Sequence, residues 1–103
     1  MRQFDVFTNP SERASANVPF VIILQSDLVY QTKTVVVAPL VAAYGLRENQ
    51  QLYPVLELEG RRVAVTVTEL ATLPRMALKR YVTSLEHERA RIIAALDPLF
   101  TGF

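Results

Sequence analysis

The chain has 103 residues, half of them hydrophobic, and its eleven Lys and Arg against ten Asp and Glu give a formal net charge of +1. This length suits one compact domain with a core of its own, so we expect a single domain over residues 1–103. The near-neutral charge argues against a nucleic-acid-binding surface, which needs a clear basic excess. The chain has no Cys, which excludes a disulfide framework and is consistent with a reducing cytoplasm.

Neither a secretory signal nor a membrane span is predicted. The opening residues MRQFDVF have no apolar core of the kind that a signal peptide needs. The longest apolar runs, residues 19–24 and 35–46, fall well short of the roughly 20 residues of a membrane-spanning helix. We therefore expect a soluble cytoplasmic protein without a membrane partner.

The first part of the chain has the pattern of β-strands. Residues 3–8 alternate in character, which predicts a strand with both faces partly covered. Residues 9–17 are polar and rich in turn formers, so they predict an exposed loop. Residues 20–24 are continuously apolar and mostly β-branched, which indicates a central strand buried on both faces, or on one face plus a subunit contact. The stretch LVYQTK that follows predicts a turn in which Leu28 and Val29 are exposed.

Two further features extend the β pattern to about residue 68. Residues 34–42, TVVVAPLVA, predict another strand, in which Pro39 lacks a backbone N–H and so indicates an edge or a bulge. Residues 52–70 predict a hairpin that turns at Glu59 and Gly60 and continues with alternating Val residues. Together these segments predict about five strands.

The periodicity changes at residue 72, from which one long helix is predicted. Thr72 is suited to cap a helix, and Pro74 is suited to its first turn. Apolar residues then recur at intervals of three and four from Leu78 to Leu96. The Asp-Pro pair that follows predicts the end of the helix, because the residue before a proline disfavours helical torsions. The expected fold is mainly β, in the α+β class, with a long C-terminal helix.

The side chains that an active site requires do not come together in this pattern. His87 is the sole histidine, and its acidic neighbours fan away from it on a helix, where successive residues lie about 100° apart. The three Gly are widely separated and form no phosphate-binding loop. The Glu residues before the hairpin turn face Arg residues after it, which indicates charge pairs across two strands. We expect no enzyme activity, metal or cofactor.

Seven short stretches, spread from one end of the chain to the other, share their order and approximate spacing with one protein family. They are QFDVF, QSDLV, VAPLV, LYPVLEL, VTELATLP, LEHERARI and the final FTGF. Together they make the whole chain resemble the CcdB family, the toxin half of bacterial toxin–antitoxin pairs that act on DNA gyrase.

This resemblance implies a small antiparallel SH3-like barrel or sheet of a type shared with some toxin ribonucleases, a C-terminal helix and a homodimer. It implies no catalysis. Toxins of this family insert into the dimer of gyrase A subunits, trap the enzyme on cleaved DNA, and are neutralised by a cognate CcdA-like antitoxin. The family's gyrase-binding positions correspond here to Leu28, Val29, Thr101, Gly102 and Phe103.

Candidate contacts for such an antitoxin occur in two places. Basic residues stand in the first turns of the predicted helix, and polar and charged residues stand in the exposed loop near the N-terminus. An antitoxin with a disordered acidic tail would fold onto such a surface as it binds. The expected contacts are Asn9, Glu12, Arg13, Arg75, Lys79 and Arg80.

Thr101 departs from the family pattern, which has a Trp at this position. A Trp buries about 150–250 Å² and often dominates an interface, so its replacement leaves two other functions open. One is a non-toxic or retargeted dimer that binds an antitoxin and serves autoregulation of its operon. The other is an endoribonuclease, which is an analogy of fold and lacks a convincing general base. Its phosphate site would use Arg61, Arg62, Thr66 and Thr68.

Overall fold

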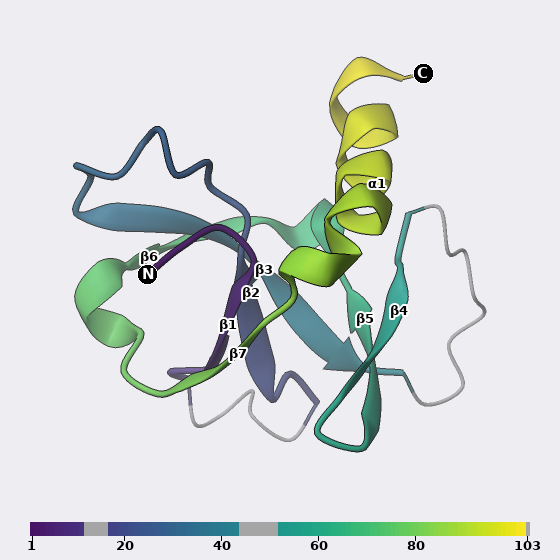
Figure 1. Ribbon diagram of the computed structural model, residues 1–103, viewed down its shortest axis with the longest axis horizontal. Helices are drawn as coiled ribbons and strands as arrows, with labels where there is room; N and C mark the ends of the chain where they lie inside the picture. Colours follow the sequence, from purple (N-terminus) through teal and green to yellow (C-terminus); the bar gives the residue numbers. More distant parts are fainter. Residues whose placement is uncertain (12–16, 44–51, 103) are drawn as a thin grey trace.

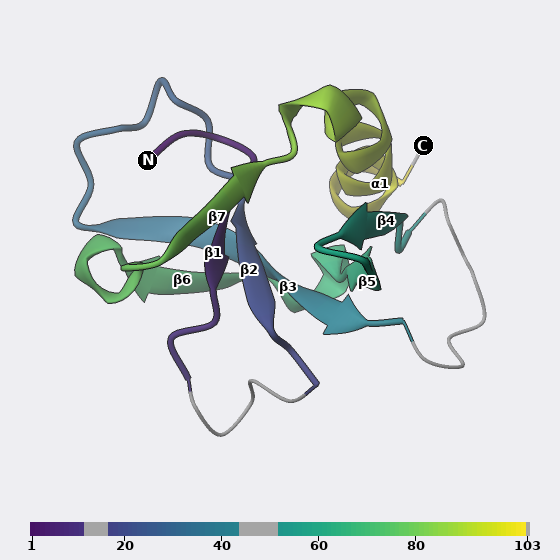
Figure 2. The same cartoon turned by 60° about the horizontal axis from the view of Figure 1, so that its bottom comes forward.

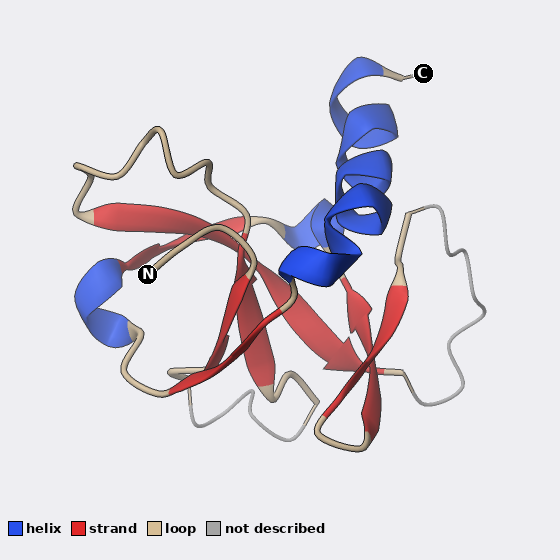
Figure 3. Ribbon diagram, viewed as in Figure 1, coloured by secondary structure: helices blue, strands red, loops and turns tan. Residues whose placement is uncertain are grey.

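The computed structural model of the protein describes residues 1–11, 17–43 and 52–102 (Figure 1). Within these residues, seven strands form one antiparallel sheet and an α-helix follows near the C-terminal end (Figure 3). The expected mainly β fold with a C-terminal helix is therefore confirmed. The strands are β1 Asp5–Thr8, β2 Phe20–Ile23, β3 Thr34–Ala42, β4 Val55–Leu58, β5 Arg61–Val65, β6 Ala71–Pro74 and β7 Tyr81–Ser84. The α-helix is α1 Arg89–Thr101, and the 3-10 turns are η1 Val67–Glu69, η2 Arg75–Ala77 and η3 Glu86–Glu88.

The sheet is curled into a half-barrel with the strand order β4-β5-β3-β2-β1-β7, and β6 joins it on β3 (Figure 2). One edge of the long strand β3 is shared by two neighbours. Residues 34–37 pair with β6, and residues 40–42 pair with β5. Pro39 lies between these two paired segments, and it has no backbone N–H to donate to a continuous ladder of hydrogen bonds. The irregularity predicted at Pro39 is thus a change of partner strand.

The sheet has an apolar core on each of its faces. Phe20 and Ile22 of β2 belong to the main core, where they are joined by Ile92 of α1. Val21 and Ile23 of the same strand belong to a second, smaller core on the other face. β2 is therefore buried on both faces, as its continuous apolar run predicts, and this double burial fixes its register.

The hairpin of β4 and β5 turns at Glu59 and Gly60, as predicted. Both residues have positive φ, 50° and 73°, which is the combination of a type I′ turn. The register places Glu57 opposite Arg62, so acidic and basic residues face each other across the two strands.

The helix predicted from residue 72 is wrong over its first half. Residues 71–74 form β6, residues 75–77 form η2 and residues 81–84 form β7. The first half of β3 and the outer edge of β1 are the pairing partners of these two strands. This tertiary pairing overrides the local helical spacing. In the described part of the chain the sheet consequently has seven strands, where the sequence predicts about five.

Helix α1 also ends later than predicted, because it runs through Pro98 to Thr101. A proline inside a helix removes one backbone hydrogen bond. Ile93, Leu96 and Leu99 pack against the main core, and Leu99 reaches it only because the helix continues past Pro98. Neither α1 nor any other helix in the described segments is long and apolar enough to span a membrane.

Candidate binding site

The loop formed by residues 25–33 connects β2 to β3 (Figure 1). It carries a run of exposed apolar side chains. Leu28 is 90% exposed and Val29 is 49% exposed, and the neighbouring Tyr30 is exposed as well. Single exposed apolar residues are common, but adjacent ones form a patch of the kind that contacts partners. The predicted exposure of Leu28 and Val29 is confirmed.

The residues just before this apolar pair hold the loop in shape. The backbone carbonyl of Ser26 accepts the N–H of Val29 at 3.0 Å, and the side-chain hydroxyl of Ser26 accepts the N–H of Leu28 at 3.2 Å. The carboxylate of Asp27 accepts the backbone N–H of Gln3 at 2.8 Å. Ser26 therefore closes a turn under the pair, and Asp27 ties that turn to the N-terminal segment.

Gln25 links the loop to β3 through its side chain. Its side-chain amide donates to the carbonyl of Val29 at 2.6 Å and to the hydroxyl of Thr32 at 3.0 Å. Its side-chain oxygen accepts the N–H of Val36 at 3.1 Å. A single side chain thus connects the middle and the end of the loop to the sheet.

The end of α1 carries the other predicted contact residues. Thr101 is exposed, and its hydroxyl donates to the carbonyl of Asp97 at 2.6 Å. Gly102 has a φ of +76°, the left-handed conformation that commonly ends a helix, and its N–H donates to the carbonyl of Pro98 at 3.1 Å. Phe103 lies outside the described residues.

The loop and the helix end lie apart in the molecule. Figures 1 and 2 both place residues 25–33 at the upper left of the view and the C-terminal end of α1 at the right. The four predicted gyrase-contact residues that the structure describes therefore fall in two separate patches of one chain.

A comparison with protein families identifies the family of the chain. The family model described as CcdB protein matches residues 3–102, which is nearly the whole chain. The chain belongs to the CcdB family. A search of curated proteins finds no match. The resemblance read from the seven short stretches is therefore confirmed.

The antitoxin contacts predicted in the N-terminal loop of this CcdB-family chain are only partly visible. Asn9 sits at the base of that loop, where its side-chain amide donates to the carbonyl of Val18 at 2.8 Å and its oxygen accepts the N–H of Ser11 at 2.9 Å. Glu12 and Arg13 lie outside the described residues. In the described part, Asn9 has a structural role because it joins the two ends of the loop.

The three basic residues predicted as antitoxin contacts do not lie in an α-helix. Lys79 and Arg80 are exposed in the connection between η2 and β7. Arg75 is half-buried against the 25–33 loop, and its guanidinium donates to the carbonyl of Thr32 at 2.6 Å. Arg75 therefore differs from the other two, because its guanidinium is hydrogen-bonded to the loop.

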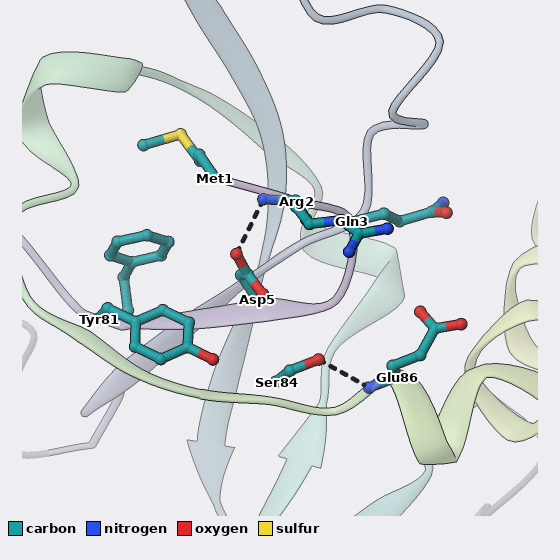
Figure 4. A pocket seen from close by; sticks show the side chains of 8 residues that line it. Met1, Arg2, Gln3, Asp5, Tyr81, Ser84 and Glu86 are labelled. Carbon is teal, nitrogen blue, oxygen red and sulfur yellow. Dashed lines mark hydrogen bonds between the residues drawn. The ribbon is translucent and has the colours of Figure 1, made fainter.

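A hollow of about 650 Å³, which sequence reasoning did not predict, lies between the N-terminal residues and β7 (Figure 4). Its aromatic wall is formed by Phe7 and Tyr81, whose rings meet edge to face with centroids 5.8 Å apart. Its buried carboxylate, Asp5, already accepts the N–H of Arg2 at 2.8 Å. Among the residues that the structure describes, no group of His, Asp and Glu could hold a metal ion. The hollow is lined by Met1, Arg2, Gln3, Asp5, Phe7, Tyr81, Ser84 and Glu86.

The four positions considered for a ribonuclease phosphate site do not converge. Arg61 and Arg62 begin β5 next to the hairpin turn, whereas Thr66 follows the other end of that strand. Five residues of extended chain place Arg61 and Thr66 roughly 16 Å apart. The hydroxyl of Thr68 is within 3.1 Å of the Tyr53 hydroxyl, with which it shares a hydrogen bond. This arrangement does not favour an RNA-cleaving site.

Proposed function

We propose that this protein is a toxin of a toxin–antitoxin module that binds the DNA gyrase A subunit and traps gyrase on cleaved DNA, which blocks replication. The observation that supports the proposal is the 25–33 loop, which presents Leu28 and Val29 to solvent. We propose that these two residues are the gyrase contacts that the resemblance to the family implies. The toxin would act in the cytoplasm by binding alone, without catalytic residues or a cofactor. A cognate CcdA-like antitoxin would neutralise it.

The proposed toxin acts as a homodimer. One chain holds its two contact patches apart from each other, so a single protomer does not join them into one surface. A two-fold axis brings the same surface of both chains together and so doubles each patch across one assembly. The end of α1 extends beyond the sheet (Figure 1), and Phe100 near that end is 70% exposed and offers apolar surface for such a contact.

A second candidate function is a non-toxic or retargeted dimer that binds an antitoxin and serves autoregulation. The observation that favours it is Thr101, whose hydroxyl is turned back onto the helix by its bond to the carbonyl of Asp97. A Thr here offers a methyl group where the family's Trp offers a large apolar surface. Loss of such a hot-spot contact often costs about 2 kcal/mol or more, which is about 30-fold in affinity.

A gyrase cleavage assay separates the two candidates. The purified protein is incubated with gyrase from the source bacterium, supercoiled plasmid and ATP, and linear DNA is measured after detergent and protease treatment. A gyrase poison yields linear DNA, and a variant truncated after Phe100 should lose at least about 30-fold in potency. If the intact, folded dimer yields no linear DNA but binds its antitoxin, the second candidate is supported and gyrase poisoning is contradicted.

A matched pair of loop variants tests the apolar patch itself. Leu28→Asp places a charge in the patch and should also reduce potency by at least about 30-fold. Gln31→Asp places the same charge at an exposed polar position of the same loop and should change potency by less than about threefold. Equal losses would mean that charge, and not the apolar contact of Leu28, determines the response.

A further inference from the structure

We infer that Arg75 is a positioning residue, which fixes the 25–33 loop in the shape that presents Leu28 and Val29; its purpose rests on the proposed gyrase contact. Arg75 begins η2, far from the loop in sequence. Its Nε donates to the carbonyl of Thr32 at 2.6 Å, and its Nη2 donates to the carbonyl of Val29 at 3.2 Å. Nη2 also lies 3.3 Å from the hydroxyl of Thr32.

The pairing of β6 with β3 places Arg75 beside the loop. β6 ends at Pro74, which pairs with Thr34 at the start of β3. The next residue, Arg75, donates its backbone N–H to the carbonyl of Lys33 at 2.9 Å. Because Lys33 is the last residue of the loop, the guanidinium reaches back across the loop from a backbone position that the strand ladder fixes.

Arg75 and Gln25 converge on the same acceptors from two different elements. Both donate to the carbonyl of Val29, whose two lone pairs can accept both hydrogen bonds. Both also reach the hydroxyl of Thr32, which donates onward to the carbonyl of Thr34 at 2.7 Å. The peptide group after Val29 is thereby held by two side chains, and this sets the direction of the apolar pair.

The contact depends on the shape of the guanidinium. Its oxygen acceptors on Val29 and Thr32 are uncharged, so the interaction is a set of directed hydrogen bonds and not an ion pair. Its Nη1 lies 3.6 Å from the Sδ of Met1, so Arg75 also contacts the first residue of the chain. A Lys would keep the charge and lose the planar fork that spans both acceptors. A loop that is fixed before binding loses less conformational freedom when it meets its target.

Backbone order measured by NMR tests this role without any target. In the intact protein, residues 28–31 should have order parameters near 0.85, which is about the value for rigid backbone, and Arg75→Ala and Arg75→Lys should lower them to below about 0.6. Lys33→Ala removes the same charge from an exposed position in the same loop and should leave them unchanged. Unchanged order parameters in Arg75→Ala would overturn the inference.

The linear-DNA assay then measures the consequence for the target. Arg75→Ala and Arg75→Lys should each require about tenfold more protein than the intact chain for half-maximal cleavage, and Lys33→Ala should not. If Arg75→Lys is as potent as the intact protein, Arg75 acts through its charge. If Arg75→Ala is weak although its loop stays rigid, Arg75 contacts the target directly. Either result would overturn the positioning role. If the intact protein cleaves nothing while the order parameters fall as expected, the proposed gyrase function fails and the positioning role of Arg75 stands.

Discussion

The 25–33 loop and the end of α1 both expose predicted contact residues, but different interactions hold them in place. The loop is held by side chains and backbone from other parts of the chain, among them Gln3 in the N-terminal segment and Arg75 in η2. The end of α1 is held by its own helix, through the hydroxyl of Thr101 and the N–H of Gly102. The loop should therefore respond to distant substitutions, and the helix end mainly to local ones.

This difference bears on where the sequence can change. Arg75 ties the loop to η2, Gln25 ties it to β3 and Asp27 ties it to the N-terminal segment, so a substitution at any of them should alter the shape of the loop. Thr101 is exposed and bonds only within its own helical turn among the described contacts, so another residue there leaves the core untouched. The departure from the family pattern therefore falls at an exposed position that the core does not constrain.

The largest expected effect comes from the residue that anchors α1. Ile92 is fully buried in the main core. Ile92→Ala should lower the free energy of unfolding by about 2–5 kcal/mol, because it removes buried methyl groups and leaves a cavity. Urea unfolding at a fixed protein concentration measures this loss, since the stability of the proposed dimer would depend on concentration.

Ile93→Ala is the matched control for the anchor. It deletes the same atoms at the neighbouring, half-buried position and should cost about 1 kcal/mol. Similar losses of stability in the two variants would contradict the role of Ile92 as the residue that anchors α1 in the main core.

Much of the sheet could be predicted because its signals are local. The continuous apolar run of β2 and the Glu59–Gly60 turn each determine structure within a few residues. Residues 71–84 could not be predicted in the same way, because their apolar spacing also fits a helix. What decides their structure is the pairing that β3 and β1 offer, and those edges exist only once the sheet has formed.

The candidate site also has one part that could be predicted from the sequence and one part that could not. The exposure of Leu28 and Val29 follows from a turn pattern between two strong strands, so the sequence was sufficient to predict it. The role of Arg75 could not be predicted, because nothing near it in sequence relates it to the loop. Only the register that pairs Thr34 with Pro74 brings its guanidinium to Val29.

An intermediate effect is expected at the loop. Gln25→Ala removes the donor to Val29 and leaves the N–H of half-buried Val36 without its side-chain acceptor. The free energy of unfolding should fall by about 1–3 kcal/mol. Gln31→Ala changes an exposed residue of the same loop and should stay within about 0.5 kcal/mol of the intact protein. Equal unfolding midpoints for the intact protein and Gln25→Ala would show that the loop does not depend on this bridge.

The smallest effect is expected at the helix end. Gly102 has a φ of +76°, and a Cβ added there would meet nothing within 4 Å, so the cost of a side chain is backbone strain alone. Gly102→Ala should cost about 1 kcal/mol, and Gly102→Asn should cost less, because Asn adopts the left-handed conformation more readily. Since a last turn frays easily, the loss should show as faster amide hydrogen exchange in residues 99–102 and hardly at all in the melting temperature.

The same two variants test whether the helix end and the loop are independent within one chain. The residues that hold the loop lie outside α1, so the order parameters of residues 28–31 should keep their intact values in Gly102→Ala and Gly102→Asn. If the loop becomes mobile in either variant, the two patches are coupled within one chain, and the helix end is not a purely local structure. If only residues 99–102 respond, the helix end is a local structure that can change its target contact without disturbing the loop.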